Sequence, residues 1–87
     1  MELDRQVAIV TGGGRGIGRA TALELARMGA SIVIAEVDKA GAERTAADIR
    51  ALGRQASVVP TDVTSRKDLA AMVQQTLDEF SRIDILV

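Results

Sequence analysis

The residues with the clearest chemical potential form the segment Thr11–Gly18, which reads TGGGRGIG. This segment follows a short apolar run and opens a stretch with helical periodicity. Glycine has no Cβ to keep a ligand away from the backbone, and the free N–H groups at the start of a helix attract an anion. The segment therefore predicts a phosphate-binding loop rather than a flexible turn without a ligand.

The spacing of the glycines narrows the class of phosphate ligand. The P-loop pattern of ATPases can be laid on residues 13–18, but it then requires Lys and Ser or Thr, where this chain has Arg19 and Ala20. The G-x-G-x-x-G dinucleotide pattern matches the loop in no register. The spacing that is present is G-x-x-x-G-x-G, starting at Gly12. A P-loop-like ATPase is therefore the least supported function for this loop.

The elements that must position this loop follow from the apolar pattern. Short continuous apolar runs bounded by Gly or Pro predict buried strands, and apolar residues at three- and four-residue spacing predict helices. Asp38 can cap the second helix, Gly53 can end it, and Thr64 or Ser65 can cap the third. The predicted strands are 7–10, 31–35, 57–59 and 83–87, and the predicted helices are 16–28, 38–52 and a third one that ends near residue 80.

The predicted order of these elements, βαβαβαβ, indicates an α/β fold with a parallel sheet. Continuous apolar strands imply burial on both faces of the sheet, and helical connections imply right-handed crossovers. We therefore expect the first half of a Rossmann-like, doubly wound sheet with strand order 3-2-1-4. The apolar stripes expected to face the sheet are Ala42, Ala46, Ile49 and Leu52 in the second helix, and Leu69, Met72, Val73, Thr76, Leu77 and Phe80 in the third.

Composition excludes several classes of function. The chain has 87 residues, 11 basic and 12 acidic, and no Cys or His, so no basic stripe for duplex nucleic acid, no thiol nucleophile and no usual zinc site is expected. Phe80 is the only aromatic residue, which argues against binding single strands by base stacking. No apolar run approaches the roughly 20 residues of a spanning helix. We expect no metal site, no nucleic-acid or membrane partner, and a cytoplasmic location.

Four segments together resemble the classical short-chain dehydrogenases/reductases. The loop Thr11–Gly18 resembles the family's nucleotide loop, and Ile34-Ala35-Glu36 resembles the end of its second strand. Thr61-Asp62-Val63 is similar to the family's adenine-contacting pair after the third strand. Residues 83–87 resemble the strand that leads into the family's Asn-Asn-Ala-Gly segment. The four occur in order at the family's spacing, and the resemblance covers all 87 residues.

The resemblance implies a dinucleotide cofactor and assigns its contacts. In the glycine loop these are Gly12, Gly14, Arg15, Gly16, Ile17 and Gly18. Glu36 would accept hydrogen bonds from the ribose hydroxyls and would repel a 2′-phosphate, which favours NAD. The alternative interpretation of Glu36 is an acid of the loop that only contacts solvent. Asp62 would accept from the adenine amino group while the backbone of Val63 flanks the ring; Asp62 could instead cap the following turn. Arg15 leaves NADP possible, because a guanidinium can hold a 2′-phosphate, but it could also be a solvated cation or pair with Glu36.

The family's catalytic residues have no counterpart in this chain. The resemblance implies hydride transfer between a nicotinamide and a small carbonyl or alcohol substrate, carried by Tyr, Lys, Ser and Asn. The sequence has no Tyr and no Asn, and Lys39 and Lys67 lie far from the family's Tyr-x-x-x-Lys helix. We expect residues 1–87 to be a partial NAD(P)-binding domain, cut in its fourth strand, inactive alone and homo-oligomeric when complete. The alternative is a non-catalytic dinucleotide-binding or redox-sensing module.

Overall fold

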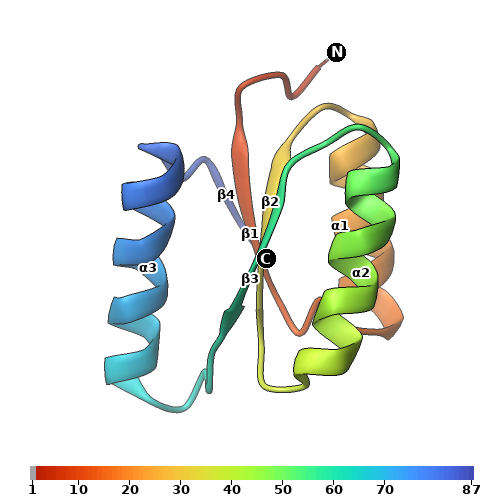
Figure 1. Ribbon diagram of the computed structural model, residues 1–87. Helices are drawn as coiled ribbons and strands as arrows, with labels where there is room; N and C mark the ends of the chain where they lie inside the picture. The colour runs from red at the N-terminus through yellow and green to blue at the C-terminus, as the bar shows by residue number, and fades with distance from the viewer. Residues whose placement is uncertain (1) are drawn as a thin grey trace.

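A computed structural model describes residues 2–87 as one sheet of four strands with three helices packed on it (Figure 1). The elements alternate along the chain, as the periodicity predicts. In chain order they are β1 (Val7–Thr11), α1 (Gly16–Arg27), β2 (Ser31–Glu36), α2 (Lys39–Ala51), β3 (Ala56–Pro60), α3 (Arg66–Phe80) and β4 (Ile85–Leu86).

The sheet is parallel throughout and has the order β3-β2-β1-β4, which confirms the predicted topology. β1 lies in the interior of the sheet, with Ile9 opposite Val33 of β2 on one side and Leu86 of β4 on the other. Because β1 and β2 are buried on both faces, their side chains are almost all apolar.

β4 is shorter than the predicted strand 83–87, because its first residues serve the turn that leaves α3. Ser81 ends α3 in a left-handed conformation, with φ of 68°, and the ladder with β1 begins only where the Asp84 N–H donates to the Val7 carbonyl at 2.9 Å. Beyond the strand, the Val87 N–H donates to the Ile9 carbonyl at 2.9 Å. The pairing with β1 therefore extends past the two residues of the strand itself.

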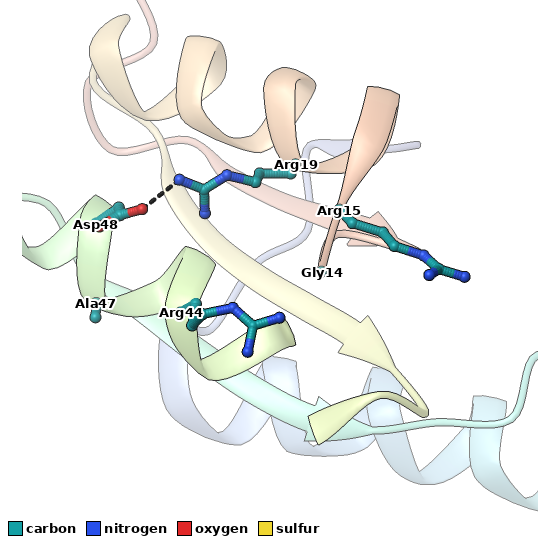
Figure 2. A pocket seen from close by; sticks show the side chains of 6 residues that line it. All are labelled: Gly14, Arg15, Arg19, Arg44, Ala47 and Asp48. Atoms are coloured by element: carbon teal, nitrogen blue, oxygen red, sulfur yellow. Dashed lines mark hydrogen bonds and ion pairs between the residues drawn. The ribbon is translucent and has the colours of Figure 1, made fainter. Parts of the chain in front are cut away.

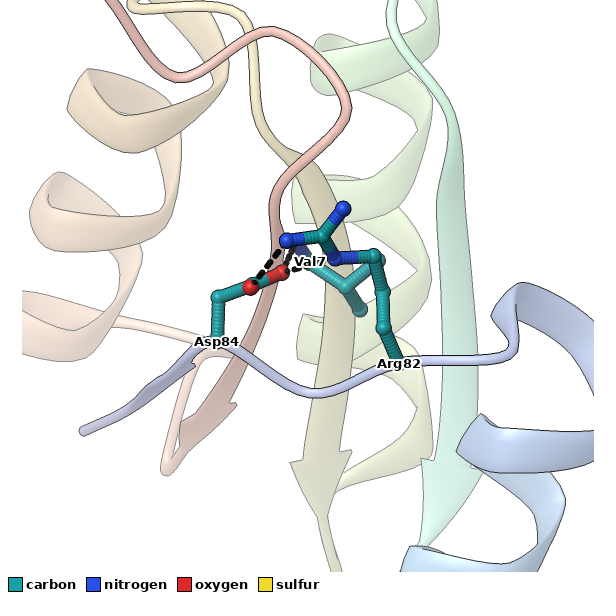
Figure 3. A network of polar contacts seen from close by, with 3 residues as sticks. All are labelled: Val7, Arg82 and Asp84. Carbon is teal, nitrogen blue, oxygen red and sulfur yellow. Dashed lines mark hydrogen bonds and ion pairs between the residues drawn. The ribbon is translucent and has the colours of Figure 1, made fainter.

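A carboxylate fastens the start of β4 to the start of β1 (Figure 3). Asp84 Oδ2 accepts from the Val7 N–H at 2.8 Å, across 77 positions of sequence. Arg82 donates to both oxygens of the same carboxylate, from Nε at 2.8 Å and from the terminal nitrogen at 2.6 Å. These contacts, the Arg82 hydrogen bond first and the Val7 N–H second, lower the pKa of Asp84. Asp84 thus acts as an ionised clamp between the ends of the described chain.

The helices form two layers, with α1 and α2 on one face of the sheet and α3 on the other (Figure 1). The core beneath α1 and α2 is rich in alanine: Ala22, Ala26, Ala42 and Ala46 have no exposed surface. Small side chains let these helices lie close to the sheet. The core beneath α3 is smaller and is centred on Ile9, Val33, Val59 and Met72.

Three residues predicted to face the core are exposed instead. Leu52 follows the last turn of α2 and is 44% exposed, because Gly53 with φ of 82° turns the chain away from the sheet there. Val73 and Leu77 are each 39% exposed, because they lie on the flank of α3 rather than under it. Periodicity located the buried side of each helix but overestimated the width of its covered stripe.

The helix starts differ in how their N–H groups are satisfied. Asp38 accepts from the Gly41 N–H at 3.2 Å and caps α2, and Ser65, rather than Thr64, accepts from the Asp68 N–H at 3.2 Å and caps α3. α1 follows Arg15, whose side chain makes no capping bond. Among the helices that the structure describes, α1 alone starts with N–H groups that no side chain caps.

The connections β1–α1, β2–α2 and β3–α3 all leave the carboxyl ends of parallel strands. They therefore gather at one edge of the sheet, the lower edge in Figure 1. Open parallel sheets bind ligands outside this edge, near the point where the strand order reverses. Here the reversal lies between β1 and β4, so the β1–α1 loop stands beside it.

Candidate functional site

The glycine loop packs against its own backbone and leaves free space in front of α1. A Cβ added to Gly18 would lie 2.1 Å from the Gly12 carbonyl oxygen, so this contact requires glycine. Gly16 has φ of 60°, and a Cβ there would meet nothing within 4 Å. The uncapped N–H groups of α1 therefore border open space, which is the arrangement that an anion site needs.

Glu36 connects the glycine loop to the turn between β2 and α2. Its Oε1 accepts from the Val37 N–H at 3.0 Å and from the Asp38 N–H at 3.3 Å. Its Oε2 accepts from the Gly14 N–H at 3.4 Å. A carboxylate oxygen has two lone pairs, so Oε1 is engaged by its two bonds, whereas Oε2 accepts one and keeps capacity for a ligand hydroxyl. Glu36 is thus a positioned carboxylate rather than a freely moving loop acid.

Asp62 follows β3, and its side chain caps the next turn, as its alternative interpretation predicted. Oδ1 accepts from both the N–H and the hydroxyl of Thr64, at 2.9 and 2.6 Å. These bonds, that of the Thr64 hydroxyl first, lower the pKa of Asp62, so the group is ionised at neutral pH. Oδ2 has no partner among residues 2–87 and remains an acceptor.

These residues meet in one cleft, which we call the edge cleft. Its volume is about 300 Å³. It has the carboxylates of Glu36 and Asp62 and the exposed apolar side chains of Val37 and Val63 in its wall. The full lining is Thr11, Gly12, Ala35, Glu36, Val37, Thr61, Asp62 and Val63. Polar acceptors beside apolar surface suit a flat ligand with hydrogen-bond donors at its edges.

A second pocket includes Gly14, whose N–H donates to Glu36 of the edge cleft, and we call it the arginine pocket. It has a volume of about 450 Å³ and is lined by Gly14, Arg15, Arg19, Arg44, Ala47 and Asp48. Figure 2 shows Arg19 turned toward Asp48, with which it pairs, and Arg15 and Arg44 extending the other way. Arg15 and Arg44 have no ion-pair partner in the described part of the chain. The predicted alternative of an Arg15–Glu36 pair is therefore absent from these residues.

Arg44 lines the arginine pocket and is a residue that the sequence alone did not indicate. It lies in α2, far along the chain from the glycine loop, and one arginine on an exposed helix face carries no signal. The packing of α2 on the loop brings it near: a Cβ on Gly14 would lie 3.1 Å from the backbone nitrogen of Ala42. Its place in the pocket therefore depends on a tertiary contact between the glycine loop and the first turn of α2.

The remaining predicted residues and features lie as follows. Ile17, in the first turn of α1, is 87% exposed and lines neither the edge cleft nor the arginine pocket. No group of His, Cys, Asp or Glu within residues 2–87 could hold a metal ion. None of the helices that the structure describes has the length and apolar character needed to cross a bilayer.

An apolar groove, the α3–β4 groove, continues from the edge cleft, with which it shares Thr11 and Val63. Its volume is about 540 Å³, and its walls are almost entirely apolar. It is lined by Ile9, Thr11, Val63, Leu69, Met72, Val73, Ile83, Leu86 and Val87. The groove explains why Val73 is exposed, because nothing in the described residues covers that flank of α3.

Comparison with known proteins gives a consistent result. The sequence model described as short chain dehydrogenase matches residues 6–87. A hydroxynaphthalene reductase of Aspergillus fumigatus is 43% identical over 100% of this chain and 32% of its own length. The 3-hydroxyacyl-CoA dehydrogenase type-2 of Drosophila melanogaster is 43% identical over 93% of this chain and 31% of its own length.

A solved structure with the same arrangement of elements is a short chain dehydrogenase/reductase from Burkholderia phymatum in complex with NAD. It superposes on this chain with a TM-score of 0.93 and 36% sequence identity, and the aligned region includes 99% of this chain. This chain covers 31% of that structure. The chain thus spans about a third of the length of the proteins that it matches.

Proposed function

This chain belongs to the short-chain dehydrogenase/reductase family, and we propose that it is the dinucleotide-binding part of an NAD(P)-dependent oxidoreductase. The observation that carries the proposal is the edge cleft. Three separate loops bring a glycine turn, Glu36 and Asp62 to the carboxyl edge of one parallel sheet. The structure of the Burkholderia phymatum relative in complex with NAD supports the choice of ligand.

The residues fit the parts of a dinucleotide one by one. The uncapped start of α1 and the open space at Gly16 suit the negative charge of a pyrophosphate. Glu36 lies where it could accept from the hydroxyls of the adenosine ribose. The free Oδ2 of Asp62 could accept from the adenine amino group, with Val63 against the ring. Gly12, Gly14, Ile17 and Gly18 complete the proposed binding set for NAD, and Arg15 joins it for a 2′-phosphate.

The cofactor would supply the chemistry of hydride transfer. We propose that in the complete protein the hydride passes to or from a small carbonyl or alcohol substrate. The residues of this chain would bind and orient the cofactor. The family's Tyr acid/base has no counterpart among them, because the sequence contains no Tyr. We accordingly propose that the 87-residue chain binds without turnover.

The choice between NAD and NADP is set by two opposing features. The carboxylate of Glu36 at the edge cleft disfavours a 2′-phosphate, because like charges repel. The arginine pocket, on the other side of Gly14, offers the unpaired cations of Arg15 and Arg44 to such a phosphate. We propose NAD as the preferred cofactor and NADP as a weaker one, held by this arginine pair.

Calorimetric titration of the chain with NAD tests the main proposal. We expect saturable binding, which Gly16→Val abolishes because its side chain fills the space in front of α1. The control is Gly53→Ala, since Gly53 also has a positive φ, of 82°, but lies at the far end of α2. Equal NAD binding by Gly16→Val and the unaltered chain contradicts the loop assignment, and no NAD binding by the unaltered chain contradicts the proposal.

The ratio of the NAD and NADP dissociation constants tests the cofactor preference. Glu36→Ala should weaken NAD binding and reduce the discrimination against NADP. Arg15→Ala combined with Arg44→Ala should weaken NADP binding while leaving NAD nearly unchanged. A ratio that none of these variants alters would show that Glu36 is not the ribose acid and that the arginine pocket holds no phosphate.

A further inference from the structure

The turn after β3 is held by a closed set of hydrogen bonds that includes both the backbone and the side chain of Asp62. The Asp62 N–H donates to Asp68 Oδ2 at 2.9 Å, and the Ser65 N–H donates to the Asp62 carbonyl at 2.9 Å. The Ser65 hydroxyl in turn accepts from the Asp68 N–H at 3.2 Å. The first turn of α3 therefore fixes the backbone of Asp62.

Thr64 fixes the side chain of the same residue. Its N–H and its hydroxyl both donate to Oδ1, at 2.9 and 2.6 Å, so this oxygen is fully engaged. The opposite oxygen, Oδ2, is left as the acceptor on a carboxylate that can no longer rotate freely. Asp62 and Val63 line the edge cleft, whereas Thr64 and Asp68 do not.

We infer that Thr64 and Asp68 are positioning residues that make the edge cleft selective for a ring carrying an exocyclic amino group, such as adenine. This inference rests on the proposed dinucleotide function. A carboxylate oxygen accepts from an amino group but repels a carbonyl oxygen at the same ring position. Selectivity therefore depends on how firmly Oδ2 is held in place, which is the task of Thr64 on the side chain and of Asp68 on the backbone.

If Thr64 only stabilised the fold, its loss would weaken the binding of all dinucleotides alike. If Thr64 positions the Asp62 carboxylate, its loss changes the ratio of the dissociation constants of two dinucleotides that differ at the adenine amino group. The probes are NAD and nicotinamide hypoxanthine dinucleotide, in which an oxygen replaces the amino group of adenine. Calorimetry of the unaltered chain should give tighter binding of NAD. Thr64→Val removes the hydroxyl with little change of shape and should reduce this preference by about 3- to 10-fold, the net effect of one hydrogen bond of ordinary strength.

Matched variants separate positioning from folding. Thr64→Ser keeps the hydroxyl and should restore the preference. Asp68→Ala should reduce it by a smaller factor, and Asp68→Asn, which still offers an acceptor to the Asp62 N–H, should restore most of it. Ser65→Ala removes the cap of α3 without touching the Asp62 carboxylate, so it should lower the melting temperature and leave the preference unchanged.

The outcomes distinguish the two proposals. If the unaltered chain binds neither dinucleotide, the proposed function and the inference both fail. If it binds both equally, dinucleotide binding stands and the inference is wrong. The inference is also overturned if Thr64→Val leaves the preference unchanged, or if Ser65→Ala reduces it as much as Thr64→Val does.

Discussion

Gly16 and Gly18 are both required as glycine, for different physical reasons. Gly18 faces the backbone of its own loop, with 2.1 Å from a hypothetical Cβ to the Gly12 carbonyl oxygen, and backbone cannot move aside as a flexible side chain can. Gly16 faces open space but has φ of 60°, which costs a residue with a Cβ about 1 kcal/mol. Gly18 is needed for packing, and Gly16 is needed for its backbone conformation and for the access it leaves to the start of α1.

Alanine at these two positions should therefore have different effects on stability. Gly18→Ala should lower the free energy of unfolding by about 1–3 kcal/mol, because the loop backbone must shift to relieve the overlap. Gly16→Ala should lower it by about 1 kcal/mol. Urea unfolding in the absence of ligand measures both values, and a Gly18→Ala chain as stable as the unaltered one would contradict the contact with Gly12.

The ionisation of Asp62 provides a second prediction at the scale of single residues. Because Thr64 donates two hydrogen bonds to the carboxylate, the folded state favours its ionised form and lowers its pKa. Thr64→Val should raise that pKa toward the ordinary value, as followed by NMR of the carboxyl carbon. Thr64→Ser should leave it low, and a pKa that stays low in Thr64→Val would show that the hydroxyl bond has little influence.

At the scale of elements, α2 begins with a side-chain cap and α1 does not. Asp38→Ala should lower the free energy of unfolding by about 1 kcal/mol, because the Gly41 N–H loses its acceptor. Arg15→Ala is the matched control at α1: it should change stability little, because Arg15 makes no capping bond. Thermal unfolding of the two variants without ligand measures the difference, and an equal loss in both would contradict it.

At the scale of the whole molecule, Asp84 holds β4 to β1 as an ionised group (Figure 3). Its folded pKa is lowered, chiefly by Arg82, so its contribution to stability is present at neutral pH. The contribution is lost as the pH falls below about 4 toward the folded pKa, because the protonated carboxyl no longer accepts these bonds in the same way.

Asp84→Asn should therefore lower the melting temperature at pH 7 and have a smaller effect at pH 3. The control is Glu24→Gln, because Glu24 pairs with Arg27 on the exposed surface of α1 and should contribute little at either pH. If Asp84→Asn lowers the melting temperature by the same amount at pH 7 and at pH 3, the stabilising role of the ionised carboxylate is contradicted.

The topology could be predicted from the sequence because its cues are local. Continuous apolar runs marked the strands, Asp38 and Gly53 marked the ends of α2, and strands separated by helices indicated the order 3-2-1-4. The residues that line the edge cleft could be predicted as neighbours only where they follow strand ends. Arg44 joins it through the packing of α2 on the loop, and Asp68 through a hydrogen bond to Asp62, and neither contact leaves a trace in the spacing of residues.

The two cores depend on different lengths of chain, and this has a consequence for biosynthesis. Every fully enclosed residue of the core under α1 and α2 precedes residue 57, whereas the core under α3 requires Met72. A ribosome delivers the amino end first, so β1, β2 and β3 with two helices could assemble while later residues are still being added. Until Ile85 emerges, one side of β1 has no neighbouring strand, and the nascent chain exposes the central strand of its own sheet to chaperones and to other chains.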